Sequence, residues 1–365
     1  MAGSFLPNLY NADEQSIKIA LTGTPIIIPS NRSGSLKNLD KVSTKQIFGD
    51  YIHKYYYNAS IDDGYTLKLM REKIKTTYQE TIQKNIQHIS QELQIKKGEI
   101  KAEEIHQHPH YAQPLLDYVV EDLHNSRLIL DNQSIGGMLV CVNNHQAELL
   151  YRLFLEKYQD NPQYSVQSAI LVLDDSENIT HSNKKQDIED YKQGKIDLLI
   201  VNKMLLTGFD CPRLKKLYLD RKIKAHNLLQ ALTRVNRPYQ DFRYGYIVDF
   251  ANIEEEFNRT NQAYLLELKQ AHQGFLDEDE EDVWNSIFIS EDEIKQRLDE
   301  IEDVLWEFDC NNLEKFRQQI DHEEKETLYQ LRNILQSAKE LWHFLRLKKD
   351  QDNLGISNKK GAIFE

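Results

Sequence analysis

The chain is poor in the residues that build disulfide-linked or metal-bound scaffolds. It holds only three cysteines among 365 residues, Cys141, Cys211 and Cys310, and no pair has the C-x-x-C spacing. Structural disulfides and a zinc site are therefore not expected, and a reducing cytoplasm fits this cysteine usage. No apolar stretch approaches the roughly 18 residues of a membrane span, and no signal peptide is evident, so we expect no membrane association.

A second absence concerns nucleotide binding and metal binding. The pattern G-x-x-x-x-G-K-[ST] does not occur, so the usual loop that cradles phosphates is missing. The alternating histidines His106, His108 and His110 suggest a metal at first sight, but Pro109 interrupts them. Because a metal site needs a closed set of ligands and no cysteine or carboxylate pattern completes this one, we predict no metal site.

The charge of the chain is unevenly distributed. The formal net charge is −13, but residues 251–310 hold 19 acidic and 4 basic residues, so the rest of the chain carries +2. The total therefore does not exclude a nucleic-acid role for residues 1–250. The acidic segment is either a solvated helical surface or a surface that docks on a basic partner, since like charge opposes DNA phosphates.

Hydrophobic patterning indicates an α/β domain at 114–250. Uninterrupted runs rich in Val, Ile and Leu are typical of strands that are buried on both faces, and their alternation with helices favours a doubly wound parallel sheet. The pattern predicts strands at 137–143, 166–173, 196–201, 214–219 and 244–250, with helices at 114–131, 146–158, 184–193 and 225–235.

The flanking regions have other patterns. Residues 16–28 indicate a short strand that ends in a turn, 65–69 another strand, 71–97 a helix and 98–113 a charged connector. The aromatic block at 48–65 could stack bases, although a packed helical core is the favoured interpretation. Long helices are expected at 252–275 and 290–346, and a polar tail at 350–365.

Two segments carry the strongest chemical signal. Gln230, Arg234 and Arg237 are spaced to share one face of the helix predicted at 225–235, and guanidinium groups match phosphate oxygens bidentately. Such arginines stabilise the charge that develops on a γ-phosphate. In the turn before them, Gly208 lets the backbone approach a ligand, and Asp210 can hold a ribose hydroxyl or pair with an arginine.

Each of these residues also has a plainer interpretation. The arginines can be a surface pair that forms salt bridges, and the turn can be an ordinary one.

Two further residues are candidates for DNA contact. Thr207 can bind a DNA phosphate together with the nearby backbone amides. Asn143 can contact a DNA backbone, although residues in its position more often cap the next helix.

The order of the motifs resembles motifs III, V and VI of superfamily 2 helicases. These are Thr22-Gly23-Thr24-Pro25, Thr207-Gly208-Phe209-Asp210 and Gln230-x-x-x-Arg234-x-x-Arg237. With Ile47-Phe48-Gly49-Asp50-Tyr51, Asp62-Asp63-Gly64-Tyr65 and His226-Asn227-Leu228-Leu229-Gln230-Ala231, the chain resembles the R (HsdR) subunit of type I restriction enzymes over residues 16–250.

The resemblance implies a role for each motif residue. Arg234 and Arg237 would act in catalysis and, with Gly208, Asp210 and Gln230, line the ATP site. Thr207 and Asn143 would contact DNA, and Thr22, Gly23 and Thr24 would couple two motor domains. It also implies ATP and Mg²⁺ as cofactors, and double-stranded DNA and the methylation (M) and specificity (S) subunits as partners.

The resemblance further implies an incomplete motor. The nuclease domain, the Walker A lysine and the Walker B acidic pair have no counterpart here, so we expect a C-terminal portion of the subunit that is inactive alone. The expected division is a strand remnant of the first RecA-like domain (1–29), a mainly helical connecting region (30–113), the second RecA-like domain (114–250), a helical domain (251–349) and a tail (350–365). The alternative is a non-catalytic module that docks on partner subunits or DNA.

Overall fold

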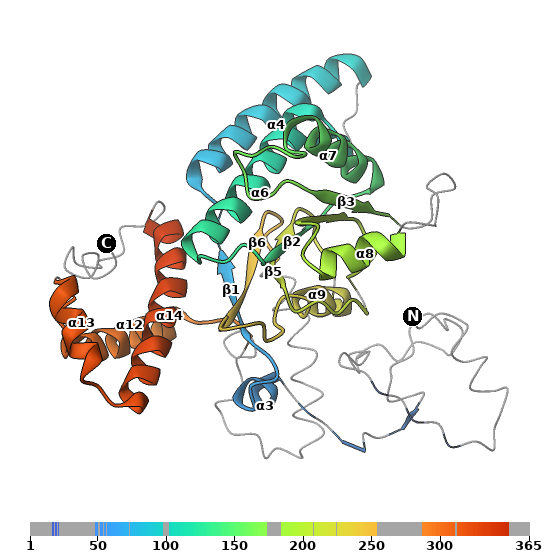
Figure 1. Cartoon of the computed structure of the whole chain (residues 1–365). Coiled ribbons are helices and arrows are strands. Elements are labelled where there is room, and N and C mark those ends of the chain that lie inside the picture. Colours follow the sequence, from blue (N-terminus) through green and yellow to red (C-terminus); the bar gives the residue numbers. More distant parts are fainter. Residues whose placement is uncertain are drawn as a thin grey trace.

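The described part of the chain forms an α/β unit with a helical region beside it (Figure 1). The computed structural model describes residues 17, 19, 21, 48, 49, 52, 53, 55, 57–72, 74–97, 102–173, 184–206, 208–223, 225–253, 287–310 and 312–349. No helix in these ranges is both long enough and apolar enough to cross a membrane.

A six-stranded sheet is the centre of the α/β unit. Its strands are β1 (Lys68–Glu72), β2 (Gly136–Val140), β3 (Ala169–Val172), β4 (Leu198–Val201), β5 (Leu214–Leu219) and β6 (Tyr244–Asp249). They lie in the order β1-β6-β5-β2-β4-β3, and every neighbouring pair is parallel. All residues of β2, β4, β5 and β6 are buried, including the two lysines within β5.

Helices cover both faces of the sheet, so the doubly wound parallel fold is confirmed (Figure 1). One face carries α4 (Thr76–Lys97), α6 (Pro109–Ile129) and α7 (Asn144–Lys157), and the other carries α8 (Lys184–Lys192) and α9 (Ala225–Leu232). Alternate strand residues enter two separate cores: Leu139 and Ile200 face the first, and Met138 and Leu199 face the second. The short helices α3 (Tyr57–Asp62) and α5 (Ala102–His106) precede β1 and α6.

The sheet begins earlier in the chain than residue 114. Strand β1 pairs with β6 along its whole length, from Lys68 opposite Tyr244 to Glu72 opposite Val248. Helix α4 packs on α6 and belongs to the same unit. The expected domain start was therefore too late, because a single strand followed by a helix carries no local signal of the sheet it will join.

The helix expected to open at Pro114 begins at Pro109, and the expected connector at 98–113 contains α5 and the first turn of α6. Pro109 suits this position because the first helical residue needs no N–H partner. Pro114 lies inside the helix and cannot donate to the carbonyl of His110. The side chain of Asn85 supplies the missing donor, with Nδ2 2.8 Å from that oxygen, so the helix continues through the proline.

The C-terminal helical region consists of α12 (Glu291–Trp306), α13 (Leu313–Asp321) and α14 (Lys325–Lys349), where one long helix was expected. Ser290 and Glu293 form a capping box that starts α12. The region is joined to the sheet through the backbone, since the amide of Ile289 donates to the carbonyl of Leu69 at 2.9 Å. Most of the helix expected at 252–275 lies outside the described residues.

Two expectations for the N-terminal part need correction. Ile17, Ile19 and Leu21 are exposed and lie in no strand, so the strand expected at 16–28 is not seen at the three positions that are described. In the aromatic block, Tyr55 and Tyr65 are 50% and 68% exposed, so the favoured packed core is wrong for these two rings. A strand forms only where a partner strand takes its backbone hydrogen bonds, which a local apolar pattern cannot specify.

Candidate functional site

The two segments singled out in the sequence meet at one edge of the sheet. Residues 208–212 precede β5 and residues 234–238 precede β6, so both lie where these parallel strands begin. Arg237 Nε is 3.3 Å from Asp210 Oδ1, and the two side chains are 48% and 68% exposed. Asp210 was expected to pair with an arginine of the helix, and it does pair with an arginine, but Arg237 lies beyond the end of α9. Because an exposed ion pair contributes little to stability, its partners can be exchanged readily.

The two arginines do not share a helical face as predicted. Helix α9 ends at Leu232, Arg234 lies in the following turn, and Arg237 lies beyond it. Pro238 is part of the reason, since a residue before proline disfavours the helical conformation. Arg237 approaches Asp210, and Arg234 approaches Phe209, because the chain turns after α9 ends. The spacing of the arginines in the sequence does not by itself place them there.

Arg234 connects the end of α9 to the turn at 208–210. Its Nε donates to the carbonyl of Gln230 at 2.8 Å, Nη2 donates to Thr233 Oγ1 at 3.2 Å, and Nη1 donates to the carbonyl of Phe209. Gln230 thus contributes its backbone oxygen to this arrangement. In this conformation Arg234 is part of the scaffold of the site, and it would have to release these oxygens to contact a phosphate.

Gly208 is required by backbone conformation. Its φ of +70° lies in the left-handed region that favours glycine, and a Cβ built on it would meet no atom within 4 Å. The side chain of the next residue, Phe209, is buried and lies 6.2 Å from the ring of Tyr191. The turn therefore combines a buried aromatic anchor with an exposed carboxylate at Asp210.

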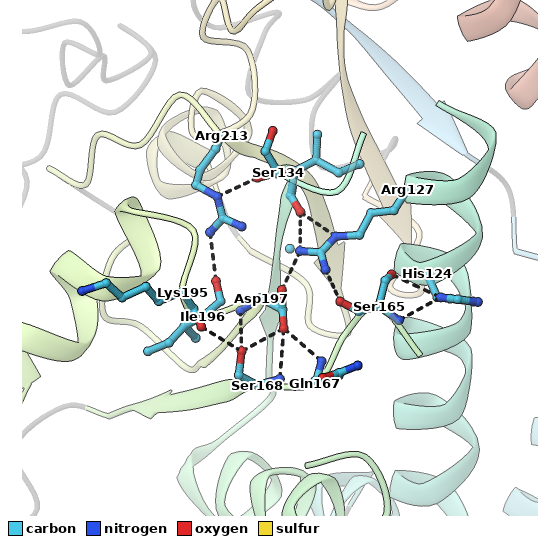
Figure 2. Close-up of polar contacts among 12 residues, drawn as sticks. His124, Arg127, Ser134, Ser165, Gln167, Ser168, Lys195, Ile196, Asp197 and Arg213 are labelled. Atoms are coloured by element: carbon cyan, nitrogen blue, oxygen red, sulfur yellow. Dashed lines mark hydrogen bonds and ion pairs between the residues drawn. The ribbon is translucent and has the colours of Figure 1, made fainter. Parts of the chain in front are cut away.

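Two buried arginines fix the same edge of the sheet (Figure 2). Arg213, directly after the turn, donates to the carbonyls of Ser134 at 2.7 Å and Ile196 at 2.9 Å. Arg127 of α6 pairs with Asp197 at 2.8 Å. Their guanidinium groups face backbone oxygens and a carboxylate inside the protein, so they hold the segments around Ser134 and Asp197 at this edge. The sequence analysis did not identify either residue, and no local pattern marks them.

The backbone that carries Arg237 is held from two sides. The amide of Leu67, just before β1, donates to the carbonyl of Asn236 at 2.6 Å, and Lys215 Nζ donates to the carbonyl of Arg237. Lys215 is fully buried. Burial lowers its pKa to about 7, against the opposing effect of the Glu340 carboxylate.

A close backbone contact adds a third restraint on this segment. A Cβ on Gly245 of β6 would lie 2.2 Å from the carbonyl oxygen of Val235, so only glycine fits there. Glu340 of α14 lies beside the same strand, and its carboxylate accepts hydrogen bonds from the amide of Arg243 and the hydroxyl of Tyr246. Burial raises the pKa of Glu340 to about 7. The sequence did contain a signal that Lys215 is functionally important, because two successive lysines in a strand that is buried on both faces are unusual.

Asn143 lies at the opposite edge of the sheet, after the carboxyl end of β2. Its Oδ1 accepts the amide of Gln146 at 3.0 Å, so it caps α7 and the plainer interpretation is confirmed. The structure therefore does not bring Asn143 to the arginines. Thr207, Thr22, Gly23 and Thr24 lie outside the described residues.

The three histidines have separate partners. His106 Nδ1 lies 3.1 Å from Asp220, and His108 Nε2 lies 3.5 Å from Glu92. The amide of His110 donates to the ring of His108 at 3.2 Å. Within the described ranges, no three histidine, cysteine or acidic side chains gather as metal ligands.

A nucleotide phosphate fits the exposed pair better than the buried groups. The guanidinium of Arg237 is half exposed and pairs with an exposed carboxylate, so phosphate oxygens can take the place of Asp210 without burying a charge. Arg127, Arg213 and Lys215, by contrast, donate to oxygens inside the protein. Among these four described residues, Arg237 is the one that presents its charge outward.

Two family models match the chain. The model for domain 3 of the type I restriction enzyme R subunit matches residues 133–252, and that of the SWI2/SNF2 ATPase matches residues 2–103. Among solved structures, a fragment assigned as an HsdR subunit of a type I restriction enzyme from Vibrio vulnificus is 17% identical with a TM-score of 0.39, and the match covers 60% of this chain and 38% of that chain.

Curated relatives agree with these models. The protein assigned as the MjaIXP type I restriction enzyme endonuclease subunit of Methanocaldococcus jannaschii is 27% identical over 82% of this chain and 28% of its own length. The MjaVIIP subunit of the same organism is 43% identical over 28% of this chain and 9% of its own length. The HindI type I restriction enzyme endonuclease subunit of Haemophilus influenzae is 23% identical over 67% of this chain and 24% of its own length. The chain thus spans under a third of the length of each of these relatives, and these matches show that it is similar to the R subunits of type I restriction enzymes.

Proposed function

We propose that this chain supplies the arginine-bearing wall of an ATP site that forms between two domains of a double-stranded DNA translocase. In this proposal the translocase works with endonuclease cleavage in host defence. Arg237 would contact the γ-phosphate, and Asp210 would hold the arginine in place until a nucleotide displaces it. The observation that carries the proposal is the exposed pair of Arg237 and Asp210, 3.3 Å apart, beside Arg213 and Lys215, whose side chains donate to oxygens inside the protein.

The position of the pair supports a shared site. Ligands of open α/β sheets usually bind at the carboxyl ends of the strands, whereas this pair lies at the amino ends of β5 and β6. An arginine at that edge is placed to act on a nucleotide that is held by another domain. When bound there, ATP with Mg²⁺ would provide the phosphoryl group whose developing charge the guanidinium stabilises.

The proposal includes inactivity of the chain alone. The sequence contains no phosphate-cradling loop, and an arginine acts on a transition state only when the nucleotide is held in line. We therefore expect no DNA-stimulated ATPase from the purified chain. Activity is expected only when a separately expressed segment supplies the Walker A motif.

The test replaces the exposed arginine and uses a matched control. We expect Arg237→Ala to lower kcat of the reconstituted ATPase by about 10³-fold, because arginines of this kind contribute roughly 10³ to 10⁵. Arg332 of α14 is an exposed arginine that pairs with another exposed carboxylate, Asp241, at 2.7 Å, and Arg332→Ala should leave kcat unchanged. Equal activities of the two variants, or ATPase from the chain alone, would contradict the proposal.

The opposite edge of the sheet is the proposed DNA side. Asn144 and Asn202 hydrogen-bond to each other at 2.9 Å, and Arg221 Nη1 donates to Asn202 at 2.7 Å. Lys203 and Lys222 are exposed beside them. Phosphate contacts of this kind depend on basic side chains and position a duplex without reading its sequence. Contacts through Thr207 and Asn143, and assembly with M and S subunits, belong to the same proposal.

A docking module remains a second candidate because of one observation. The helical region exposes large apolar side chains at Trp306, Leu313 and Tyr329, which are 90%, 74% and 66% accessible. Side chains of this kind are enriched where proteins associate. If Trp306→Ser abolished assembly with the M and S subunits while Arg237→Ala left ATPase unchanged, docking would be the better account of the chain.

A further inference from the structure

Lys215 occupies an irregular position in the sheet. Gly136 of β2 lies opposite Leu214, but the next residue, Gly137, lies opposite Lys216, so Lys215 is the extra residue of a bulge in β5. Pairing of β5 with β6 also begins only at Lys216. Bulges of this kind redirect a side chain and are found beside active sites. Here the bulge allows two successive lysines to be buried in different surroundings.

The two lysines have different partners. Lys216 Nζ contacts Glu72 and Asp122 at 2.7 and 2.6 Å, so its charge is matched by adjacent carboxylates. Lys215 Nζ donates to the backbone carbonyl of Arg237. A buried ammonium group is costly unless it is compensated, so placing one against this carbonyl makes the position of residue 237 part of the packing of the core.

The buried carboxylate that offsets Lys215 comes from outside the sheet. Glu340 of α14 is fully buried, and its charge acts on Lys215. The same carboxylate accepts the amide of Arg243, which precedes β6. One side chain of the helical region thus influences both ends of the segment that runs from Arg237 to β6.

We propose that Lys215 is a positioning residue for Arg237, and that Glu340 is its counter-charge, so that the C-terminal helices and the arginine-bearing edge are energetically coupled. This inference rests on the function proposed above for Arg237. It assigns the helical region a second role, because a change in the packing of α14 would alter where the arginine is presented.

The first test uses hydrogen–deuterium exchange of the full chain and needs no ATPase. Lys215→Met removes the donor and keeps the unbranched apolar part of the side chain, and should increase exchange about tenfold or more at residues 233–237 and at the amide of Leu67. Tyr218→Phe is the matched control, since it removes a buried 2.8 Å hydrogen bond to Asp122 from the same strand. Glu340→Gln should give a smaller change at the same residues, and it serves if the lysine variant does not fold.

The second test measures coupling in the reconstituted ATPase. Lys215→Met should lower kcat about tenfold to a hundredfold and leave KM for ATP nearly unchanged, because misplacement of a catalytic group by about 1 Å has that effect. In the Arg237→Ala background the same substitution should have no further effect, whereas a general structural defect would lower both equally.

The outcomes separate the two proposals. Unchanged exchange at 233–237 in the Lys215 and Glu340 variants, or an equal increase in Tyr218→Phe, would overturn the positioning role. An unaffected ATPase in Arg237→Ala would overturn the proposed function, while the exchange result would still decide whether Lys215 holds the segment.

Discussion

The buried charge cluster around Lys216 allows a stability prediction to be worked from the structure. Its ammonium group makes three contacts, to Glu72 at 2.7 Å, Asp122 at 2.6 Å and Ser126 at 2.9 Å. Lys216 is fully buried, and the two carboxylates are 2% and 4% exposed. Each ammonium hydrogen therefore has an acceptor, and the cluster connects β5 to β1 and α6.

Lys216→Met would leave two carboxylates buried without their cation. Breaking a buried ion pair by removing one partner costs about 3–5 kcal/mol, and two stranded carboxylates place this variant at the upper end. Domains unfold with about 5–15 kcal/mol, so the loss is a large fraction of the total stability. The exposed pair of Lys157 and Asp117 is the comparison, and Lys157→Met should cost under about 1 kcal/mol.

Urea unfolding followed by circular dichroism measures both losses. The cause is tested by a triple variant in which Glu72 and Asp122 are also replaced, by Gln and Leu, because removing all the charges should restore most of the stability. A loss below about 1 kcal/mol for Lys216→Met would refute the reasoning. A triple variant as unstable as the single one would also refute it, since the cost would then come from packing and not from uncompensated charge.

The remaining predictions concern the segment that carries Arg237. Gly245→Ala should destabilise the chain by about 1–3 kcal/mol and lower reconstituted ATPase, because its Cβ would lie 2.2 Å from the Val235 carbonyl oxygen; unfolding midpoints and kcat would show it. Glu340, with its pKa raised from 4.5 to about 7, binds a proton in the folded state that the unfolded chain lacks, so the unfolding free energy should fall as pH rises between these values. The pKa of Lys215 is lowered from 10.5 to about 7, so the unfolding free energy should rise with pH above pH 7. Glu340→Gln should remove only the fall of the unfolding free energy between pH 4.5 and 7.

Much of the sheet could be predicted from the sequence. Five strands between residues 136 and 249 were expected within a few residues of their observed bounds, because runs rich in Val, Ile and Leu without polar alternation indicate burial on both faces. Strand β1 was also expected near its position, but not its place in this sheet. Register and strand order depend on contacts between residues far apart, such as Lys68 and Tyr244, which one sequence does not reveal.

The candidate site was predictable in its residue types and less so in its geometry. Arg237 and Asp210 do meet, but through a turn that follows α9, where the sequence suggested one helical face. Lys215 and Glu340 were not anticipated, because their significance depends on tertiary burial. Pro114 was expected to start a helix, but the amide of Asn85, 29 residues earlier, satisfies the carbonyl that the proline cannot reach.

The backbone contact between Leu69 and residues 288–289 has a consequence for solubility. Strand β1 is at one end of the order of the described strands, and an edge strand can pair with another chain through its outer amides and carbonyls. The isolated bridge to Phe288 and the hydrogen bond from Ile289 occupy the middle of that edge. A shorter protein that stopped at residue 253 would keep all six strands and uncover this edge, and we expect it to self-associate through β1, so the helical region also protects the sheet against aggregation.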